Sequence, residues 1–167
     1  EVLKFPPPQK FLENLDYILS YRKKQSHTRK TLNLFYPASR YKHKNHAYLK
    51  KLSEKILQST INQIVCTVDE DISLKYKFPS YVTNKISYLG EISYDSVMAH
   101  YQNCDALLFL SLDESLGLPL LEAAVLGIPI IVPRLSYSTD ILGHNYPFLF
   151  DLTSTKDFHK KITLAYN

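Results

Sequence analysis

The residues of this chain that are best suited to chemistry lie in one short segment, residues 114–122, which reads E-S-L-G-L-P-L-L-E. The segment joins a predicted buried strand to a predicted helix. Gly117 removes a side chain at that turn, and the first amides of the helix, near Gly117 and Leu118, have no partners within the helix. Amides at a helix start favour an anion. This arrangement predicts a site for an anionic group such as a diphosphate.

Two carboxylates flank that turn. Glu114 precedes the predicted helix, and Glu122 lies about one turn inside it. Carboxylates accept hydrogen bonds from hydroxyls in pairs, and a carboxylate that faces a ribose beside a phosphate site is a common Rossmann arrangement. Spacing alone leaves an ordinary alternative open, in which Glu114 is solvated and Glu122 pairs locally.

Residues 114–122 resemble the E-x7-E motif of the retaining GT-B glycosyltransferases of family four, whose usual form is E-G-F-G-L-P-x-x-E. Glu114 and Glu122 fall on the two glutamates of the motif, and the Gly-Leu-Pro between them matches its centre. Ser115 and Leu116 stand where the family often has Gly and Phe, which is a mild departure.

The resemblance implies a role for each part of this segment. Glu114 would contact the donor sugar, and Glu122 would bind the ribose of the nucleotide. The amides of Leu116, Gly117 and Leu118 would face the diphosphate or the sugar.

A second segment, residues 35–46, resembles the first strand and following loop of the same family. Many members carry an Arg there, followed a few residues later by Lys-Asn. Lys44 and Asn45 match the second pair, and either Ser39 or Arg40 stands at the Arg position. The resemblance implies that Lys44 and Arg40 neutralise the donor diphosphate and the leaving group, because a fixed cation near developing phosphate charge is a strong catalytic factor. A solvated loop is the alternative.

A third segment, residues 88–92, resembles the family's F-x-G-x-V/I sequence, whose backbone usually contacts the nucleobase. Leu89 and Gly90 are therefore expected to bind substrate, and a plain strand end followed by a turn is the alternative. His43 and His46 form only a weak metal signal without a third ligand. The resemblance implies that basic residues and helix amides replace a metal, so neither a metal nor another cofactor is expected.

Apolar runs predict the elements that position these loops. Strands are expected at residues 32–38, 61–68, 86–89, 106–111, 129–132 and 148–150. Helices are expected at residues 45–58, from Ser93 onward, at residues 118–126, near residues 139–142 and after Ser154, whereas residues 69–85 read as irregular. Such alternation predicts an α/β fold, Rossmann-like, with three α/β/α layers and a mostly parallel sheet of about six strands. This is one half of a GT-B fold, and ligands of such sheets bind beyond the carboxyl ends of the strands.

Residues 1–30 differ from the rest of the chain. They hold a stiff proline run, a short segment at residues 11–19 with helical apolar spacing and a basic stretch at residues 22–30, and we interpret them as an interdomain linker and basic segment. Residues 31–167 are expected to form the nucleotide-sugar-binding domain. Because the chain starts at Glu1 and enters a proline run, we expect an N-terminal acceptor-binding domain to be missing.

Composition limits the class and the compartment. A content of 45% hydrophobic residues excludes disorder of the whole chain, and a net charge of +4 suits an anionic small ligand without demanding nucleic acid. Cys66 and Cys104 adjoin apolar runs and are expected to be buried free thiols in a reducing compartment. No apolar run approaches the roughly 20 residues of a membrane helix. We expect a cytoplasmic protein that lies peripherally at the inner face of the cytoplasmic membrane.

The resemblance implies transfer of a hexosyl or related sugar from a nucleotide-diphosphate donor, such as a UDP-sugar, with retention of configuration. The acceptor is expected to be a lipid-linked saccharide in O-antigen or lipopolysaccharide synthesis, and the isolated chain is expected to be inactive. Two alternatives stay open. One is a nucleotide-sugar epimerase of the same fold, and the other is a non-enzymatic basic module in which residues 22–30 bind nucleic acid or anionic lipid.

Overall fold

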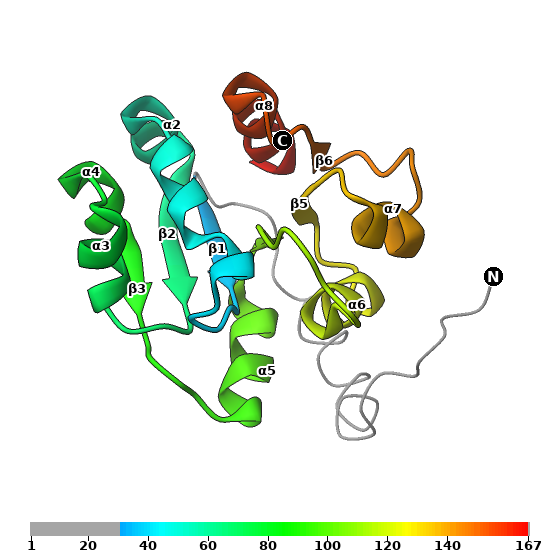
Figure 1. The fold of residues 1–167 in the computed structure, drawn as a ribbon, viewed down its shortest axis with the longest axis horizontal. Coiled ribbons are helices and arrows are strands. Elements are labelled where there is room, and N and C mark those ends of the chain that lie inside the picture. Colours follow the sequence, from blue (N-terminus) through cyan, green and yellow to red (C-terminus); the bar gives the residue numbers. More distant parts are fainter. Residues whose placement is uncertain (1–30, 167) are drawn as a thin grey trace.

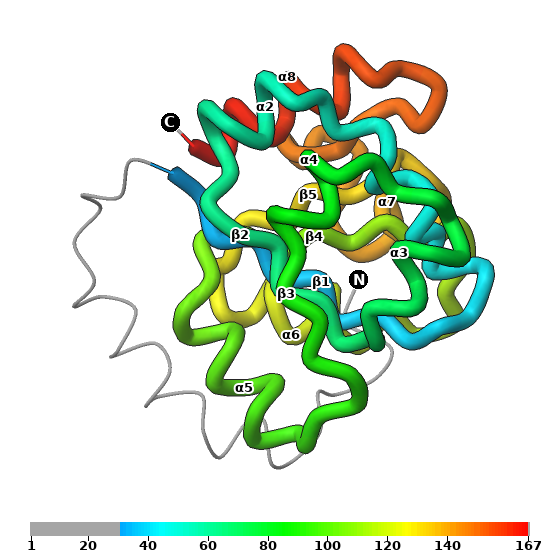
Figure 2. The backbone as a smooth tube through the Cα atoms, turned by 90° about the vertical axis from the view of Figure 1, so that its left-hand side faces the viewer, coloured from blue at the N-terminus to red at the C-terminus, as the bar shows by residue number. Residues whose placement is uncertain are grey.

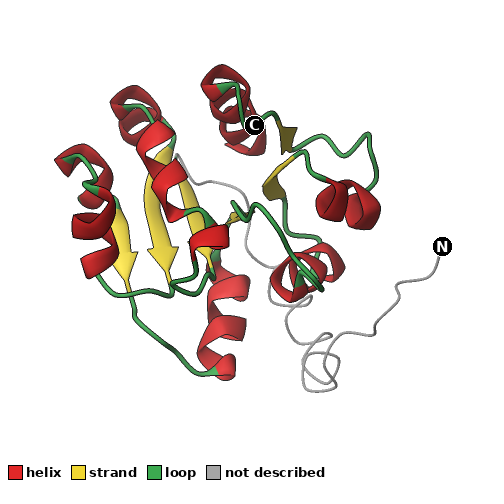
Figure 3. Ribbon diagram, viewed as in Figure 1, coloured by secondary structure: helices red, strands yellow, loops and turns green. Residues whose placement is uncertain are grey.

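Among residues 31–166, which the computed structural model of the chain describes, six strands form one sheet. They are β1 (Leu32–Tyr36), β2 (Ile61–Cys66), β3 (Ile86–Tyr88), β4 (Ala106–Leu108), β5 (Ile130–Pro133) and β6 (Leu149–Phe150). The order across the sheet is β3-β2-β1-β4-β5-β6, and each neighbouring pair runs parallel (Figures 1 and 3). The predicted Rossmann-like sheet is confirmed.

Helices cover both faces of this sheet. They are η1 (Lys42–Lys44), η2 (His46–Lys51), α2 (Glu54–Ser59), α3 (Asp71–Tyr76), α4 (Ser80–Thr83), α5 (Tyr94–Asn103), α6 (Leu118–Val125), α7 (Ser136–Leu142) and α8 (Thr155–Tyr166). Seen along the sheet, α2, α4 and α8 lie on one side of the strands, and α5 and α6 lie on the other (Figure 2). The chain therefore has the predicted α/β/α layers.

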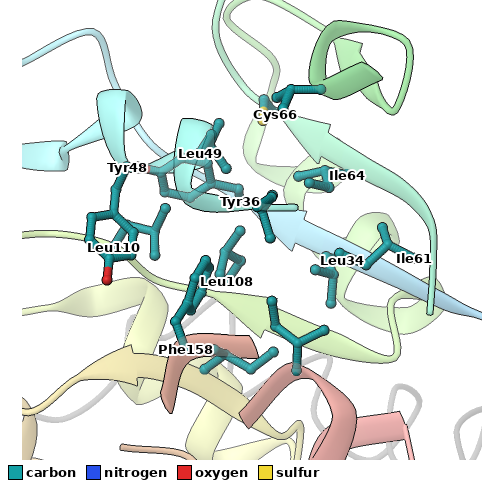
Figure 4. Close-up of a cluster of buried hydrophobic side chains, with 14 of the residues drawn as sticks. Leu34, Tyr36, Tyr48, Leu49, Ile61, Ile64, Cys66, Leu108, Leu110 and Phe158 are labelled. Carbon is teal, nitrogen blue, oxygen red and sulfur yellow. The ribbon is translucent and has the colours of Figure 1, made fainter. Parts of the chain in front are cut away.

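Strand β1 contributes to two separate parts of the core. Leu34 and Tyr36 point into a cluster that includes Phe158 of α8 (Figure 4), whereas Phe35 points into a second cluster with Tyr101 of α5. This follows from the alternation of side chains along a strand. Each fully buried large apolar side chain contributes roughly 1.5–3 kcal/mol. The loop that follows β1 therefore leaves from a strand that is anchored on both faces.

The single helix predicted over residues 45–58 is wrong. The structure has η2, then a break, then α2. Asn45 adopts a left-handed conformation with φ 58°, and Leu52 is extended, so the helix cannot run through either residue. Ser53 then begins α2 by accepting a hydrogen bond from the amide of Ile56 at 3.3 Å. Apolar spacing predicted which side chains are buried but not that the helix is interrupted.

Residues 69–85 were predicted to be irregular, and this prediction is wrong. The segment contains α3 and α4. Helix α3 has six residues and ends where Lys77 adopts a left-handed φ of 52°. Helix α4 has four residues and follows Pro79, which is extended. Helices this short give too little periodicity to be recognised from the sequence. Residues within or beside these helices, namely Asp69, Glu70 and Thr83, line an open hollow next to β3.

Other predictions concern the ends and the cysteines. The predicted linker, its short helix and its basic stretch, residues 1–30, lie outside the described residues, so the domain division stays a prediction. Cys66 and Cys104 are buried and are not joined by a disulfide, as predicted, and burial raises the pKa of the Cys66 thiol. None of the helices between residues 31 and 166 combines the length and apolar character that a bilayer crossing requires.

Candidate functional site

The loops that carry the predicted site residues leave the sheet where the strand order reverses. Strand β1 has β2 on one side and β4 on the other, so the reversal lies between β1 and β4. In open α/β sheets, ligands bind in the crevice beyond the strand ends at such a point. The loops after β1 and β4 meet there, because the amide of Leu112 donates to the carbonyl of His43 at 2.7 Å.

Lys44 and Glu114 form an ion pair at this crevice. Lys44 Nζ lies 2.5 Å from Glu114 Oε1, and the two side chains are only 17% and 10% exposed. The ammonium also lies 6.0 Å from the ring centroid of Phe109, at the outer limit of a cation–π contact. Two opposite charges that lie this close together and are largely shielded from solvent attract each other far more strongly than at an exposed site. The structure thus brings together two of the three predicted catalytic residues.

The backbone at Lys44 is held in place by a contact with the end of β1. Its carbonyl accepts a hydrogen bond from the hydroxyl of Tyr36, which is fully buried at the end of β1. Asn45, the next residue, adopts the left-handed conformation, which asparagine tolerates better than most residues. The buried strand therefore sets where the Lys44 side chain starts.

Arg40 does not join this pair. Its guanidinium forms an ion pair with Asp69 at 3.1 Å and a second one with Asp71. These three side chains are 54%, 64% and 53% exposed, respectively. Arg40 therefore links the loop after β1 to the start of α3, and a diphosphate would have to compete with two carboxylates for it.

Ser39 is exposed, and its carbonyl lies 2.8 Å from Nε2 of the buried His46. Burial lowers the pKa of His46, so the ring stays neutral and its Nε2–H donates to that carbonyl. The ring of His43 instead stacks on Tyr41, with 5.8 Å between centroids. Across the described residues no group of three or more His, Cys, Asp or Glu side chains could hold a metal ion. The two histidines thus have structural partners.

The start of α6 has the geometry that the sequence predicts. Gly117 precedes the helix with a left-handed φ of 59°, and Pro119 lies in the first turn. A Cβ on Gly117 would meet its nearest neighbour, Cδ1 of Ile141, at 3.6 Å, which is an ordinary contact. The backbone conformation, rather than a lack of space, therefore requires glycine here. Leu116 and Leu118 are exposed on either side of the turn.

Glu122 is held by a different group of residues. It is only 5% exposed, and its Oε2 accepts from the hydroxyl of Tyr101 at 3.0 Å, while Oε1 lies 3.5 Å from the hydroxyl of Tyr94. Burial raises the pKa of Glu122, and the two tyrosine hydrogen bonds oppose that rise. The two glutamates of the motif therefore have separate partners, one a cation and the other a pair of phenols.

The segment after β3 turns tightly. Gly90 has a left-handed φ of 67°, and a Cβ there would lie 2.8 Å from Oδ1 of Asp69. The amides of Leu89 and Gly90 donate to the carbonyls of Cys66 and Val68 at 3.0 and 3.2 Å. Beside this turn lies an open hollow of about 530 Å³. A ligand that binds here would meet amides that already have partners within the chain.

Sequence reasoning missed three tyrosines that support these loops. The hydroxyl of Tyr36 donates to the carbonyl of Lys44, that of Tyr101 lies 3.2 Å from the carbonyl of Pro119, and that of Tyr137 donates to Ser111 at 2.6 Å. Burial and the nearby Glu114 raise the pKa of Tyr137, so its hydroxyl stays a donor. The chain contains 13 tyrosines, and no local pattern distinguishes these.

Comparison with known proteins relates this geometry to a family. A family model described as "Glycosyl transferases group 1" matches residues 18–167. Among curated proteins, the O-antigen chain mannosyltransferase RfbU of Salmonella typhimurium (strain LT2) is 26% identical over 104 residues. These residues make up 60% of this chain and 29% of RfbU.

Two solved structures are similar in fold. WaaG, described as a glycosyltransferase involved in lipopolysaccharide biosynthesis, matches with a TM-score of 0.65 at 18% identity, over 99% of this chain and 47% of that one. AviGT4, described as a glycosyltransferase involved in Avilamycin A biosynthesis, matches with a TM-score of 0.50 at 11% identity, over 87% and 49%. At these identities the likeness concerns the fold alone. The chain spans about half the length of both structures.

Proposed function

The chain belongs to the group 1 glycosyltransferases, whose family model matches residues 18–167, and on this premise we propose that it is the donor-binding half of a retaining enzyme. The donor is a nucleotide-diphosphate sugar such as a UDP-sugar. The observation that carries this proposal is the largely buried pair of Lys44 and Glu114 at the reversal of strand order. The family match favours transfer over epimerisation or a non-enzymatic basic module.

Lys44 is the main cation for the donor diphosphate. As the bond between the sugar and the diphosphate breaks, both electrons move to the phosphate oxygen, and a fixed ammonium stabilises the charge that develops there. The amides at the start of α6, near Gly117, supply partial positive charge to the same group. The acceptor hydroxyl then attacks the same face of the sugar, and its proton leaves with the phosphate oxygen.

The carboxylates have different tasks in this proposal. Glu114 contacts the donor sugar while it orients Lys44, and Glu122 binds the ribose. Leu89 and Gly90 contact the nucleobase, and Leu116 and Leu118 flank the diphosphate or sugar. These assignments rest on the motif resemblance together with the position of each residue on the carboxyl side of the sheet.

Arg40 and Ser39 receive smaller roles. Arg40 is already paired with Asp69 and Asp71, both exposed, and this group of three side chains carries a net negative charge. Arg40 therefore contacts the diphosphate only when it leaves one of these carboxylates. Ser39 lies on the same loop, is exposed, and contributes to substrate binding in this proposal. No metal and no other cofactor takes part, because Lys44 and the α6 amides stand in for an ion.

The names of the similar proteins support the proposed partners. RfbU is described as acting on an O-antigen chain, and WaaG as acting in lipopolysaccharide biosynthesis. We propose a lipid-linked saccharide acceptor at the inner face of the cytoplasmic membrane, and a separate acceptor-binding domain that completes the site. The isolated chain then binds donor but transfers no sugar. Nucleic acid is not a partner.

Calorimetric titration with UDP and GDP tests the proposal. Lys44→Gln should weaken diphosphate binding at least about tenfold, the effect of losing one charged hydrogen bond. Uridine and guanosine, which carry no phosphate, serve as reference ligands that the substitution should not affect. Lys42→Gln is the matched control, because Lys42 is an exposed lysine of the same loop. Equal losses in both variants, or no binding by the unaltered chain, would contradict the proposal.

A further inference from the structure

Glu122 is a buried carboxylate whose two oxygens have unequal partners. Its Oε2 lies 3.0 Å from the hydroxyl of Tyr101, whereas its Oε1 lies 3.5 Å from that of Tyr94, at the limit of a hydrogen bond. Tyr101 is completely buried, and Tyr94 is partly exposed at the start of α5. Oε2 is thus held by a fully buried tyrosine, whereas Oε1 has a longer contact with a tyrosine that is partly exposed.

Tyr101 itself has little freedom to move. Its ring packs edge-on against Phe35 of β1, with 5.3 Å between centroids. Its hydroxyl also lies 3.2 Å from the carbonyl of Pro119 in the first turn of α6. Burial raises the pKa of Tyr101, which keeps the hydroxyl protonated and able to donate. The phenol therefore connects the central strand, the start of α6 and the carboxylate.

We infer that Tyr101 is a positioning residue that fixes the plane of the Glu122 carboxylate so that Oε1 faces the ribose diol of the donor. This inference rests on the proposed function, in which Glu122 binds the ribose. Binding a diol with one carboxylate needs a defined orientation of its oxygens, because hydrogen bonds weaken steeply when misaligned. A carboxylate fixed in advance also avoids the ordering cost that a mobile side chain would have on binding.

The test compares ribose recognition in the full chain and in Tyr101→Phe. UDP and GDP are titrated alongside their 2′-deoxy counterparts, and the ratio of the two dissociation constants measures the preference for the ribose hydroxyl. The unaltered chain should prefer the ribonucleotide, and Tyr101→Phe should reduce that preference about tenfold, as expected for loss of a well-aligned hydrogen bond to a charged group.

Two matched variants separate positioning from general loosening of the fold. Tyr146→Phe removes another tyrosine hydroxyl, one that accepts from the amide of Ile130 at 2.9 Å and has no link to Glu122. It should leave the ribose preference unchanged. Tyr94→Phe removes the longer contact and should reduce the preference by less than Tyr101→Phe does.

A double-substitution cycle provides a second route if Tyr101→Phe alone folds poorly. In Glu122→Gln the buried charge is gone, and adding Tyr101→Phe should then change the ribose preference by less than about twofold. A further tenfold loss in that background would show that Tyr101 acts other than through the carboxylate, and would overturn the inference.

The remaining outcomes distinguish this inference from the proposed function. If the unaltered chain prefers the ribonucleotide and Tyr101→Phe keeps the whole preference, the positioning role is wrong and the donor-binding proposal stands. If the unaltered chain binds neither diphosphate, the proposed function fails and the inference fails with it.

Discussion

Two basic residues on the loop after β1, Lys44 and Arg40, have different surroundings. Lys44 pairs with Glu114, and these side chains are 17% and 10% exposed. Arg40 pairs with Asp69 and Asp71, and these side chains are more than half exposed. In the sequence both basic residues are expected to face the donor diphosphate. In the structure one faces the crevice between β1 and β4, and the other faces the solvent beside α3.

The difference shows how burial decides what an ion pair can do. Surface pairs exchange readily with water and salt, so they hold neighbouring loops together only weakly. Each charged group of a largely buried pair has few other groups with which it can interact. A charged ligand is one of these few. In the proposed function Lys44 and Glu114 form the site for a charged ligand, whereas Arg40 mainly links two loops.

The largest expected effect comes from removing one member of the buried pair. Lys44→Met should lower the free energy of unfolding by about 3 kcal/mol, because it leaves Glu114 charged and without its cation. Arg40→Met should cost less than about 1 kcal/mol, and that cost should vanish in 1 M salt. Urea unfolding measures both. Equal losses in the two variants would contradict the contrast drawn above.

A smaller effect is expected at the turn after β3, where Gly90 lies next to Asp69, one of the partners of Arg40. Gly90→Ala should cost about 2 kcal/mol, since it forces a left-handed φ on alanine and places Cβ 2.8 Å from Oδ1 of Asp69. Gly117→Ala suffers the backbone strain alone and should cost about 1 kcal/mol. Combining Gly90→Ala with Asp69→Ala should recover the steric part. Failure to recover any stability would mean that the clash is not with Asp69.

The smallest effect should have the opposite sign. Glu122 is more buried than Glu114 but has phenols in place of a cation, and burial raises its pKa in the folded state. A raised carboxyl pKa means that ionisation opposes folding. Glu122→Gln should therefore raise the melting temperature at pH 7 by roughly 2–4 °C. The gain should shrink as the pH falls through the folded pKa toward the unfolded value of about 4.3. A lower melting temperature at pH 7 would rule this out.

The sheet, and the meeting at one edge of the loops that carry Lys44 and Glu114, were predictable because both follow from general rules. Apolar runs predicted the strands, and parallel strands collect their carboxyl-end loops at one edge. The directions of side chains on those loops follow no such rule. Arg40 turned toward Asp69 and Asp71 because α3 begins beside it, and α3 itself was too short to be recognised in the sequence.

The tyrosine contacts lay beyond prediction for a related reason. Tyr36, Tyr101 and Tyr137 are separated along the chain, and each meets its partner only after the strands and helices have packed. A buried phenol needs a hydrogen-bond partner, but the sequence does not say which carbonyl or carboxylate will provide it. Tertiary packing alone makes that choice.

The hydrogen bond from the amide of Leu112 to the carbonyl of His43 joins the loops after β1 and β4, so that they move together. Leu112 is 47% exposed, yet its amide donates a hydrogen bond to the carbonyl of His43 at 2.7 Å and should exchange slowly with deuterated solvent. That amide can exchange only when the two loops separate. Its protection factor therefore reports the frequency of that separation, and any molecule that bridges the crevice should lengthen its exchange time.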